Sequence, residues 1–331
     1  MTSQPGKPAE TSPSDPGPVH TGIEKSDTRR IRVGIGGWTF EPWRDNFFPK
    51  GLPHTRELEY ASRQVSAIEV NGTYYGTLKP ASFQRWFEET PDDFVLALKA
   101  TRYATTRKVL AEASESITRF VESGISELGS KLGPIVWQFM PNKIFESGDF
   151  EAFLNLLPQQ IDGRSLRHVV DVRNESFMTP EFLELVRRYK VATVFADAEK
   201  FPSFADITGD FVYARLMASE AVIPTGYADA ALDAWAERAR IWASGNSPDD
   251  LPSVEAPSTA APPRDVFIYF INGAKERAPA AAMALLQRLG FTPPDNSDNA
   301  GRDQTCSAAT VRRNRPWPHP AVCCGRAPTR D

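Results

Sequence analysis

The sequence predicts an α/β protein built as a TIM-type (β/α)8-like barrel of parallel strands. Eight short, nearly continuous apolar runs recur over about 260 residues, and helical patterns lie between most of them. Strands that are buried on both faces have this character. Because strand and helix alternate over this length, a barrel fits the pattern better than an open doubly wound sheet.

The eight predicted strands are rich in β-branched and aromatic residues, and each has the length of an ordinary strand. Polar side chains gather at their carboxyl ends. The strands are expected at Ile31–Gly37, Ser66–Asn71, Asp93–Lys99, Pro134–Phe139, Arg167–Arg173, Val191–Asp197, Phe211–Met217 and Asp265–Ile271.

Apolar residues at helical spacing separate these strands. In Lys108–Gly129 they recur every three or four residues, which predicts a helix with one buried face that Gly129 can end. The connection 198–210, between the sixth and seventh strands, contains Pro202 and Gly209 and is short, so we expect the ring to lack a helix there. Further helices are expected at Thr55–Gln64, Ala81–Glu89, Phe150–Leu156, Thr179–Tyr189, Asp229–Ala243 and Glu276–Leu289.

Proline clusters mark the borders of the predicted domain. Sixteen of the 28 prolines fall in three stretches, which we therefore expect to lie outside regular structure, because proline fixes φ and lacks a backbone donor. They predict a disordered tail over 1–30, a surface insertion over 246–264 and a disordered tail over 292–331. A single barrel domain then covers 31–291. The composition of 292–331 differs enough from the rest to suggest a non-native C-terminus, such as a shifted reading frame.

Charge and composition narrow the class of protein. The 38 Lys and Arg residues against 42 Asp and Glu give a net charge of −4, which offers no bulk electrostatic case for binding nucleic acid or an acidic membrane. No apolar run approaches the length of a membrane span, and the first residues do not read as a signal peptide, so we expect a soluble, cytoplasmic protein with no membrane contact. All three cysteines lie near the C-terminus, without the spacing of a zinc site.

Polar or amphipathic residues close every predicted strand, at the end of a TIM barrel where active sites form. Lys99, Arg173 and Arg215 suit an anion such as phosphate. Glu69, Asp171 and Asp197 suit acid/base catalysis or a divalent metal, for which the sequence gives no further support. The full ring is Trp38, Glu69, Asn71, Lys99, Gln138, Asp171, Arg173, Asp197, Arg215 and Asn272, and Tyr75 lies in the loop after the second strand.

Two alternatives apply to this ring. Ion pairs such as Asp171–Arg215 or Glu69–Lys99 would close the mouth of a non-catalytic scaffold. The aromatic cluster that includes Trp38, Trp43 and Tyr75 would either stack on a sugar or base, or pack the loops over the barrel.

Known motifs assign no cofactor. The stretch Gly34-Ile35-Gly36-Gly37 imitates part of a dinucleotide fingerprint, but the aromatic and proline residues that follow do not start a helix. Neither a P-loop nor a hydrolase elbow occurs. His168 opens its strand at the opposite face of the barrel, which predicts a structural role.

The chain resembles the domain-of-unknown-function 72 family, also called YecE-like proteins. The resemblance rests on eight motifs in order: Gly34-x-x-Gly37-Trp38, Glu69-Val70-Asn71-Gly72-Thr73-Tyr74-Tyr75, Ala97-Leu98-Lys99, Leu128-Gly129-x-Lys131-Leu132-Gly133-Pro134 running into Trp137-Gln138, Asp171-Val172-Arg173, Asp197, Tyr213-Ala214-Arg215-Leu216 and Tyr269-Phe270-Ile271-Asn272. It implies a TIM-type barrel with Glu69, Asn71, Lys99, Gln138, Arg173, Asp197, Arg215 and Asn272 as the functional ring, and it implies no reaction.

The chain also departs from the family pattern. The family often has Glu where Asp171 stands, and His-Gly where Met217 and Ala218 follow Leu216. Residues Ile35 and Gly36 stand where Thr and Ser are usual, so two hydroxyls are missing from the rim.

The ring leads to one main hypothesis. We expect an enzyme of unknown reaction that binds a small anionic, phosphorylated or sugar-like molecule through Lys99, Arg173 and Arg215, with Glu69 and Asp197 as the acid/base pair. Replacing Lys99 or Arg215 by alanine should then weaken binding with little loss of folding stability. A nucleic-acid binding or processing module and a closed scaffold are the alternatives. No protein partner is inferred.

Overall fold

Eight parallel strands close into a barrel in the computed structural model, which describes residues 30–256 and 261–291. All eight predicted strands are present, and hydrogen bonds link them around the ring in the order β1-β10-β9-β8-β7-β4-β3-β2. The prediction of a TIM-type barrel is confirmed. The strands are β1 (Ile31–Gly36), β2 (Ala67–Val70), β3 (Val95–Lys99), β4 (Leu132–Gln138), β7 (His168–Asp171), β8 (Ala192–Asp197), β9 (Phe211–Leu216) and β10 (Asp265–Phe270).

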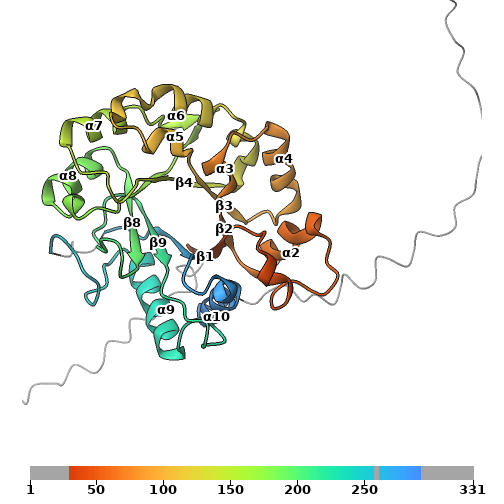
Figure 1. Ribbon diagram of the computed structural model, residues 1–331. Helices are drawn as coiled ribbons and strands as arrows, with labels where there is room; N and C mark the ends of the chain where they lie inside the picture. Colours follow the sequence, from red (N-terminus) through yellow and green to blue (C-terminus); the bar gives the residue numbers. More distant parts are fainter. Residues whose placement is uncertain (1–29, 257–260, 292–331) are drawn as a thin grey trace, which may run out of the picture. The chain divides into compact units, whose positions relative to one another are not determined.

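Helices surround the strands on the outside of the barrel (Figure 1). The longer ones are α2 (Glu57–Gln64), α4 (Pro80–Glu89), α6 (Ser114–Val121), α7 (Ser147–Asn155), α8 (Pro180–Arg188), α9 (Asp229–Ala243) and α10 (Ala278–Arg288). Single turns α3 (Gly72–Tyr75) and α5 (Arg102–Thr105) follow β2 and β3. A two-stranded hairpin, β5 (Gln160–Ile161) with β6 (Arg164–Ser165), was not predicted because two residues are too few to show alternation.

The prediction of one long helix over 108–129 is wrong, because the segment forms three shorter helical pieces. A 3₁₀ turn at Leu110–Ala113 leads into α6, and a second 3₁₀ segment covers Ile125–Lys131. The break falls at Gly124, whose φ is 105°, and a Cβ there would lie 2.6 Å from the Cα of Pro80 at the start of α4. Apolar spacing shows the buried face but not this close approach, so the break could not be read from the pattern.

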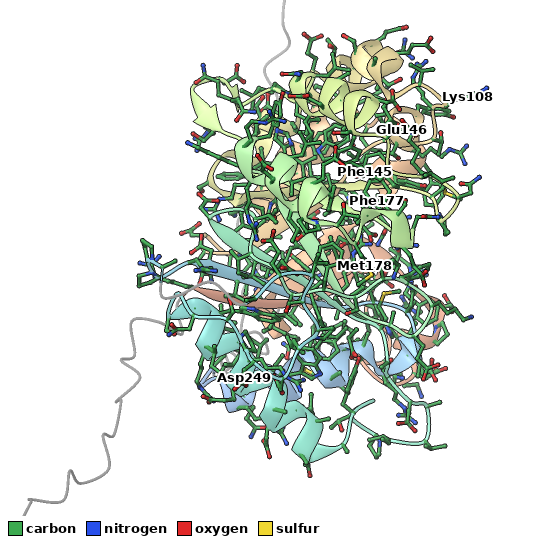
Figure 2. All side chains as sticks on the ribbon, turned by 90° about the vertical axis from the view of Figure 1, so that its left-hand side faces the viewer. Lys108, Phe145, Glu146, Phe177, Met178 and Asp249 are labelled. Carbon is green, nitrogen blue, oxygen red and sulfur yellow. The ribbon has the colours of Figure 1, made fainter. Side chains whose placement is uncertain are left out.

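No helix forms in the described connection 198–210, as predicted. This segment is covered by part of the chain that joins α9 to β10: the amide of Ala205 donates to the carbonyl of Pro252, at 2.8 Å. The chain that joins α9 to β10 runs from a helix to the start of a strand, so it reaches the amino-terminal end of the barrel. Figure 2 shows Asp249 of this connection well away from Lys108, which follows the carboxyl end of β3. Residues 1–29, 257–260 and 292–331 lie outside the described residues, so the two predicted tails and part of the predicted insertion stay predictions.

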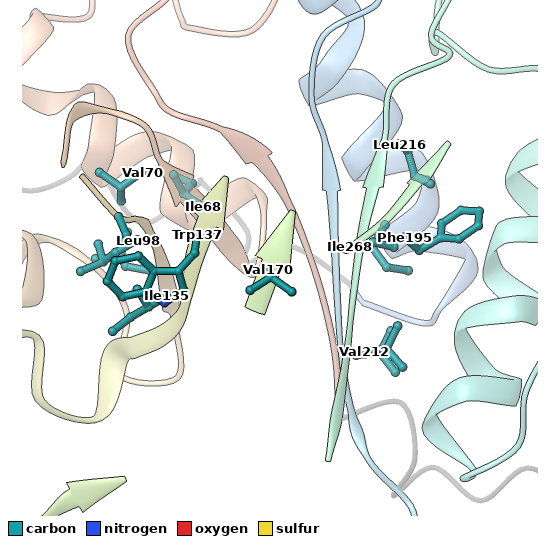
Figure 3. Close-up of a cluster of buried hydrophobic side chains, with 14 of the residues drawn as sticks. Ile68, Val70, Leu98, Ile135, Trp137, Val170, Phe195, Val212, Leu216 and Ile268 are labelled. Carbon is teal, nitrogen blue, oxygen red and sulfur yellow. The ribbon is translucent and has the colours of Figure 1, made fainter. Parts of the chain in front are cut away.

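Side chains alternate between two cores along the strands. Those that point outward pack against the helices, and Figure 3 shows part of this layer, including Ile68, Leu98 and Trp137. Those that point inward fill the barrel with a separate cluster. Its members are Ala67, Ala97, Val136, Val169, Ala192, Val194, Phe211, Tyr213, Phe267 and Tyr269. The residue two positions after an inward-facing one therefore also faces inward, which decides which polar residues meet at the rim.

Candidate functional site

Arg215, near the carboxyl end of β9, lies at the centre of the barrel mouth and is only 2% exposed. Its guanidinium donates two hydrogen bonds to Glu69, from Nε to Oε2 at 2.9 Å and from Nη2 to Oε1 at 2.7 Å. Its Nη1 donates to Gln138 Oε1, at 3.1 Å, and to Asp171 Oδ2. Burial opposes the charge, but these carboxylates outweigh it and raise the pKa of Arg215.

Two further residues complete this group. The Tyr213 hydroxyl donates to Glu69 Oε2, at 2.6 Å. Arg173 Nη2 donates to Gln138 Oε1 and to Asp171 Oδ2, at 2.9 Å each. We call the set the Arg215 cluster: Glu69, Gln138, Asp171, Arg173, Tyr213 and Arg215. Every member follows an inward-facing apolar residue by two or four positions, so the alternation of the strands brings all six together.

The Arg215 cluster changes the interpretation of two predicted contacts. The Asp171–Arg215 pair is present, whereas Glu69 pairs with Arg215 and not with Lys99. Because removing one partner of a buried ion pair costs about 3–5 kcal/mol, replacing Arg215 is expected to cost folding stability. The expectation that Arg215→Ala leaves the fold nearly unchanged does not fit this geometry.

A cavity of about 540 Å³ opens above the Arg215 cluster, a volume within the usual range for small-molecule sites. Nine of the eleven predicted site residues line it. They are Trp38, Glu69, Asn71, Tyr75, Lys99, Gln138, Arg173, Arg215 and Asn272. The mouth is therefore ion-paired at its floor and open above it, which argues against the closed scaffold.

Lys99 ends β3 and is 8% exposed. Its Nζ lies 4.1 Å from the centroid of the Tyr74 ring and forms no hydrogen bond or ion pair with residues 30–256 or 261–291. The Thr73 hydroxyl donates to the main-chain oxygen of Lys99 at 2.8 Å and so anchors its backbone. Burial, followed by the positive charge of Arg215, lowers the pKa of Lys99 to about 8.

Lys275 also lines the cavity and was missed in the sequence. Its Nζ lies 4.4 Å from the centroid of the Phe40 ring, and burial lowers its pKa. No pattern predicted this position, because Lys275 lies in a 3₁₀ turn beyond the end of β10. Its carbonyl accepts a hydrogen bond from Trp43 Nε1 at 2.9 Å, a contact between segments far apart in sequence.

The two remaining predicted acids do not line the cavity. Asp171 is buried beneath it, with Oδ2 bonded to both arginines. Asp197 follows Phe195, whose ring packs outward against Trp235, so Asp197 has the outward-facing parity of β8. Tyr227 donates to Asp197 at 3.3 Å, and burial raises the pKa of Asp197. The structure thus places Glu69 and Asp197 in different surroundings.

The aromatic residues divide between packing and lining. Trp43, Phe47 and Phe48 are buried against one another, as packing predicts, and Trp43 also lines the cavity. Trp38 lines the cavity, and Tyr75, which is 64% exposed, lies at its edge.

Among the described residues, no group of three or more His, Cys, Asp or Glu side chains is arranged to hold a metal ion. The acids of the Arg215 cluster already accept hydrogen bonds from guanidinium groups. Within the same part of the chain, no helix is long and apolar enough to span a membrane.

Comparison with known proteins agrees with the fold. The family profile described as "Protein of unknown function DUF72" matches residues 32–302. The UPF0759 protein YecE of Escherichia coli K12 is 29% identical over 142 residues, which is 42% of this chain and 48% of that protein, so the match spans about half of its length.

Two solved structures are similar over most of the chain. A DUF72 family protein from Thermotoga maritima has a TM-score of 0.59 at 21% identity, covering 79% of this chain and 99% of that one. A DUF72 family protein from Enterococcus faecalis has a TM-score of 0.59 at 17% identity, covering 79% and 96%. Likeness at this identity shows the fold alone.

Proposed function

The chain belongs to the DUF72 family of proteins of unknown function, and we propose from the geometry of its own rim that it binds a small anionic molecule, phosphorylated or sugar-like. The observation that carries this proposal is Lys99, a buried cation that lines the cavity without an acidic partner in the described part of the chain. A buried charge is costly unless it is paired, and an anionic ligand would supply the missing partner.

The charge balance of the cavity supports an anion. Within the Arg215 cluster, two arginines face two carboxylates, so its charges cancel. Lys99 and Lys275 then add positive charge that no described acid balances. Because Gln138 Oε1 already accepts from Arg173 and Arg215, the amide nitrogen of Gln138 is left to donate to a ligand oxygen.

The other lining residues suit the organic part of such a ligand. Trp38 and Tyr75 offer ring faces for a sugar, and Asn71 and Asn272 offer amides for its hydroxyls. If the protein converts its ligand chemically, Glu69 is the carboxylate placed to exchange a proton with that ligand, since Asp171 and Asp197 do not line the cavity.

Ligand binding tests the proposal through Lys99→Ala. Inorganic phosphate and phosphorylated sugars are expected to raise the thermal midpoint of the full chain, because a ligand that binds only the folded state stabilises it. Calorimetric titration of Lys99→Ala should show roughly 10- to 100-fold weaker binding, because the variant loses one charge-assisted hydrogen bond to the ligand. The matched control is Lys108→Ala, which removes an exposed cation outside the cavity and should leave affinity unchanged.

Equal affinities of the Lys99→Ala and Lys108→Ala variants would contradict the proposal.

Tyr75 is the observation that favours the second candidate, a nucleic-acid module, because an exposed ring beside a basic cavity can stack on a base. Short oligonucleotides therefore belong in the same titration. Affinity for them that falls steeply with salt, without any response to small phosphates, would favour this second candidate.

A further inference from the structure

The surroundings of Lys99 differ from those of an ordinary structural lysine. We propose that the ε-amine of Lys99 is a nucleophile that forms an imine with the carbonyl group of an anionic keto acid or phosphorylated aldehyde or ketone bound in the cavity. This inference rests on the proposed function, because the anion site would hold the carbonyl compound beside the amine.

Two other lysines in the chain show what Lys99 lacks. The buried Lys131 donates from Nζ to the carbonyls of Phe87 and Thr90, at 2.5 and 2.7 Å. Lys143 forms an ion pair with Asp149, at 2.8 Å. Such acceptors hold an ammonium group in its charged form. Lys99 has only the face of Tyr74, and the lone pair of its neutral amine is not committed to any described residue.

Burial is the main cause that raises the neutral fraction of the Lys99 amine. Burial and then the guanidinium of Arg215 lower the pKa of Lys99, Glu69 and Asp171 oppose this, and Arg173 adds a smaller lowering effect. With a pKa of about 8, roughly a tenth of the amine is neutral at pH 7, against less than about 0.1% for an ordinary lysine. Desolvation and adjacent cations are the known means of activating a lysine nucleophile.

The lining residues fit the substrate class. Arg173 and the amide of Gln138 are donors that suit a carboxylate or phosphate, and they line the same cavity as Lys99. The amine nitrogen attacks the carbonyl carbon, a C–N bond forms, and the carbonyl electrons move to oxygen, which takes the proton released from nitrogen. The nitrogen lone pair of this carbinolamine then forms the C=N bond as the C–O bond breaks, and the hydroxyl group leaves as water with the second proton of the amine. Amine and carbonyl thus give imine and water, with no change of oxidation state.

Reductive trapping tests this inference on the full chain. Glyoxylate is the probe, and cyanoborohydride transfers hydride to the imine carbon to leave a stable secondary amine. Peptide mass spectrometry should find Lys99 modified on the order of a hundred-fold faster than the exposed Lys108 at pH 7, given the larger neutral fraction. The rate should rise with pH around a midpoint near 8. Lys108→Arg, outside the cavity, should keep the labelling of Lys99, and Lys99→Arg should abolish it.

Labelling of Lys99 no faster than that of Lys108, or labelling mainly at Lys275, would overturn the inference. Pentane-2,4-dione, which is neutral and forms an ultraviolet-absorbing enaminone with amines, separates this failure from failure of the anion proposal. An enaminone at Lys99 without phosphate binding would support the reactive amine and reject the anion. Phosphate binding with no reaction at Lys99 would support the anion and reject the nucleophile.

Discussion

Two tyrosines inside the barrel differ in a single hydrogen bond. Tyr213 on β9 and Tyr269 on β10 are both fully buried, and their rings stack with centroids 5.0 Å apart. The Tyr213 hydroxyl donates to Glu69, at 2.6 Å, whereas the Tyr269 hydroxyl has no hydrogen-bond partner among the described residues. Comparing the two residues therefore separates the contribution of this hydrogen bond to the free energy of unfolding from the contribution of burying the ring.

Tyr213→Phe is expected to lower the free energy of unfolding by about 1–3 kcal/mol, because it deprives a buried carboxylate of a donor. Tyr269→Phe should change it by less than about 0.5 kcal/mol, or raise it, since the lost hydroxyl gains nothing in the fold. Urea denaturation of the two variants measures both changes. Equal effects would show that the Tyr213–Glu69 bond does not stabilise the Arg215 cluster.

At this scale, residue types were predictable and their pairings were not. Polar residues at the strand ends pointed to most of the cavity lining, including Lys99 and Gln138. The partner of Glu69 depended on side-chain reach across the barrel, and Arg215 rather than Lys99 fills that place. Asp197 does not line the cavity because its parity along β8 is outward, and the sequence does not show which parity of this strand faces inward.

The ring of helices lacks a member between β8 and β9, and the carboxylate of Asp206 binds the segment that covers this gap. Asp206 accepts hydrogen bonds from the amides of Val254, at 2.8 Å, and Glu255, at 3.0 Å. Arg187 adds an ion pair to Glu255, at 2.6 Å. These contacts tie the connection between α9 and β10 to the extended segment 198–210, in the place that a helix would otherwise cover.

Asp206→Ala is expected to cost about 1–2 kcal/mol and to speed proteolysis within 246–256, because two backbone donors lose their acceptor. Asp249→Ala is the matched control, since Asp249 is exposed in the same segment. Limited proteolysis with peptide mapping, together with urea denaturation, gives both quantities. Identical cleavage rates in the two variants would mean that Asp206 does not hold this segment.

Strands were more predictable than helices for a physical reason. A buried parallel strand is apolar along its whole length, so each of the eight runs was visible in the sequence without knowledge of its neighbours. The break at Gly124 depends on Pro80, which lies on a different helix, and no local pattern contains that contact.

For the whole molecule, the alternation of strand and helix over about 260 residues favoured a closed barrel over an open doubly wound sheet, and the eight strands do close into a ring. The surroundings of His168 could not be derived in this way. It begins β7 at the amino-terminal end of the barrel and is buried there, as a structural role predicts. Its Nδ1 accepts from Trp137 Nε1, at 3.1 Å, and its Nε2 donates to the carbonyl of Pro158, at 2.7 Å.

These bonds use both ring nitrogens of a neutral imidazole, and burial lowers the pKa of His168 to about 4, below the value of about 6.5 expected when unfolded. Between these values the unfolded chain binds more protons, so the contribution of His168 is complete above about pH 6.5 and is lost as the pH falls toward 4. Urea denaturation at pH 7 and 4.5 should show wild type losing about 2–3 kcal/mol more than His168→Gln. An equal loss in His168→Gln would assign the acid sensitivity of the barrel to other groups.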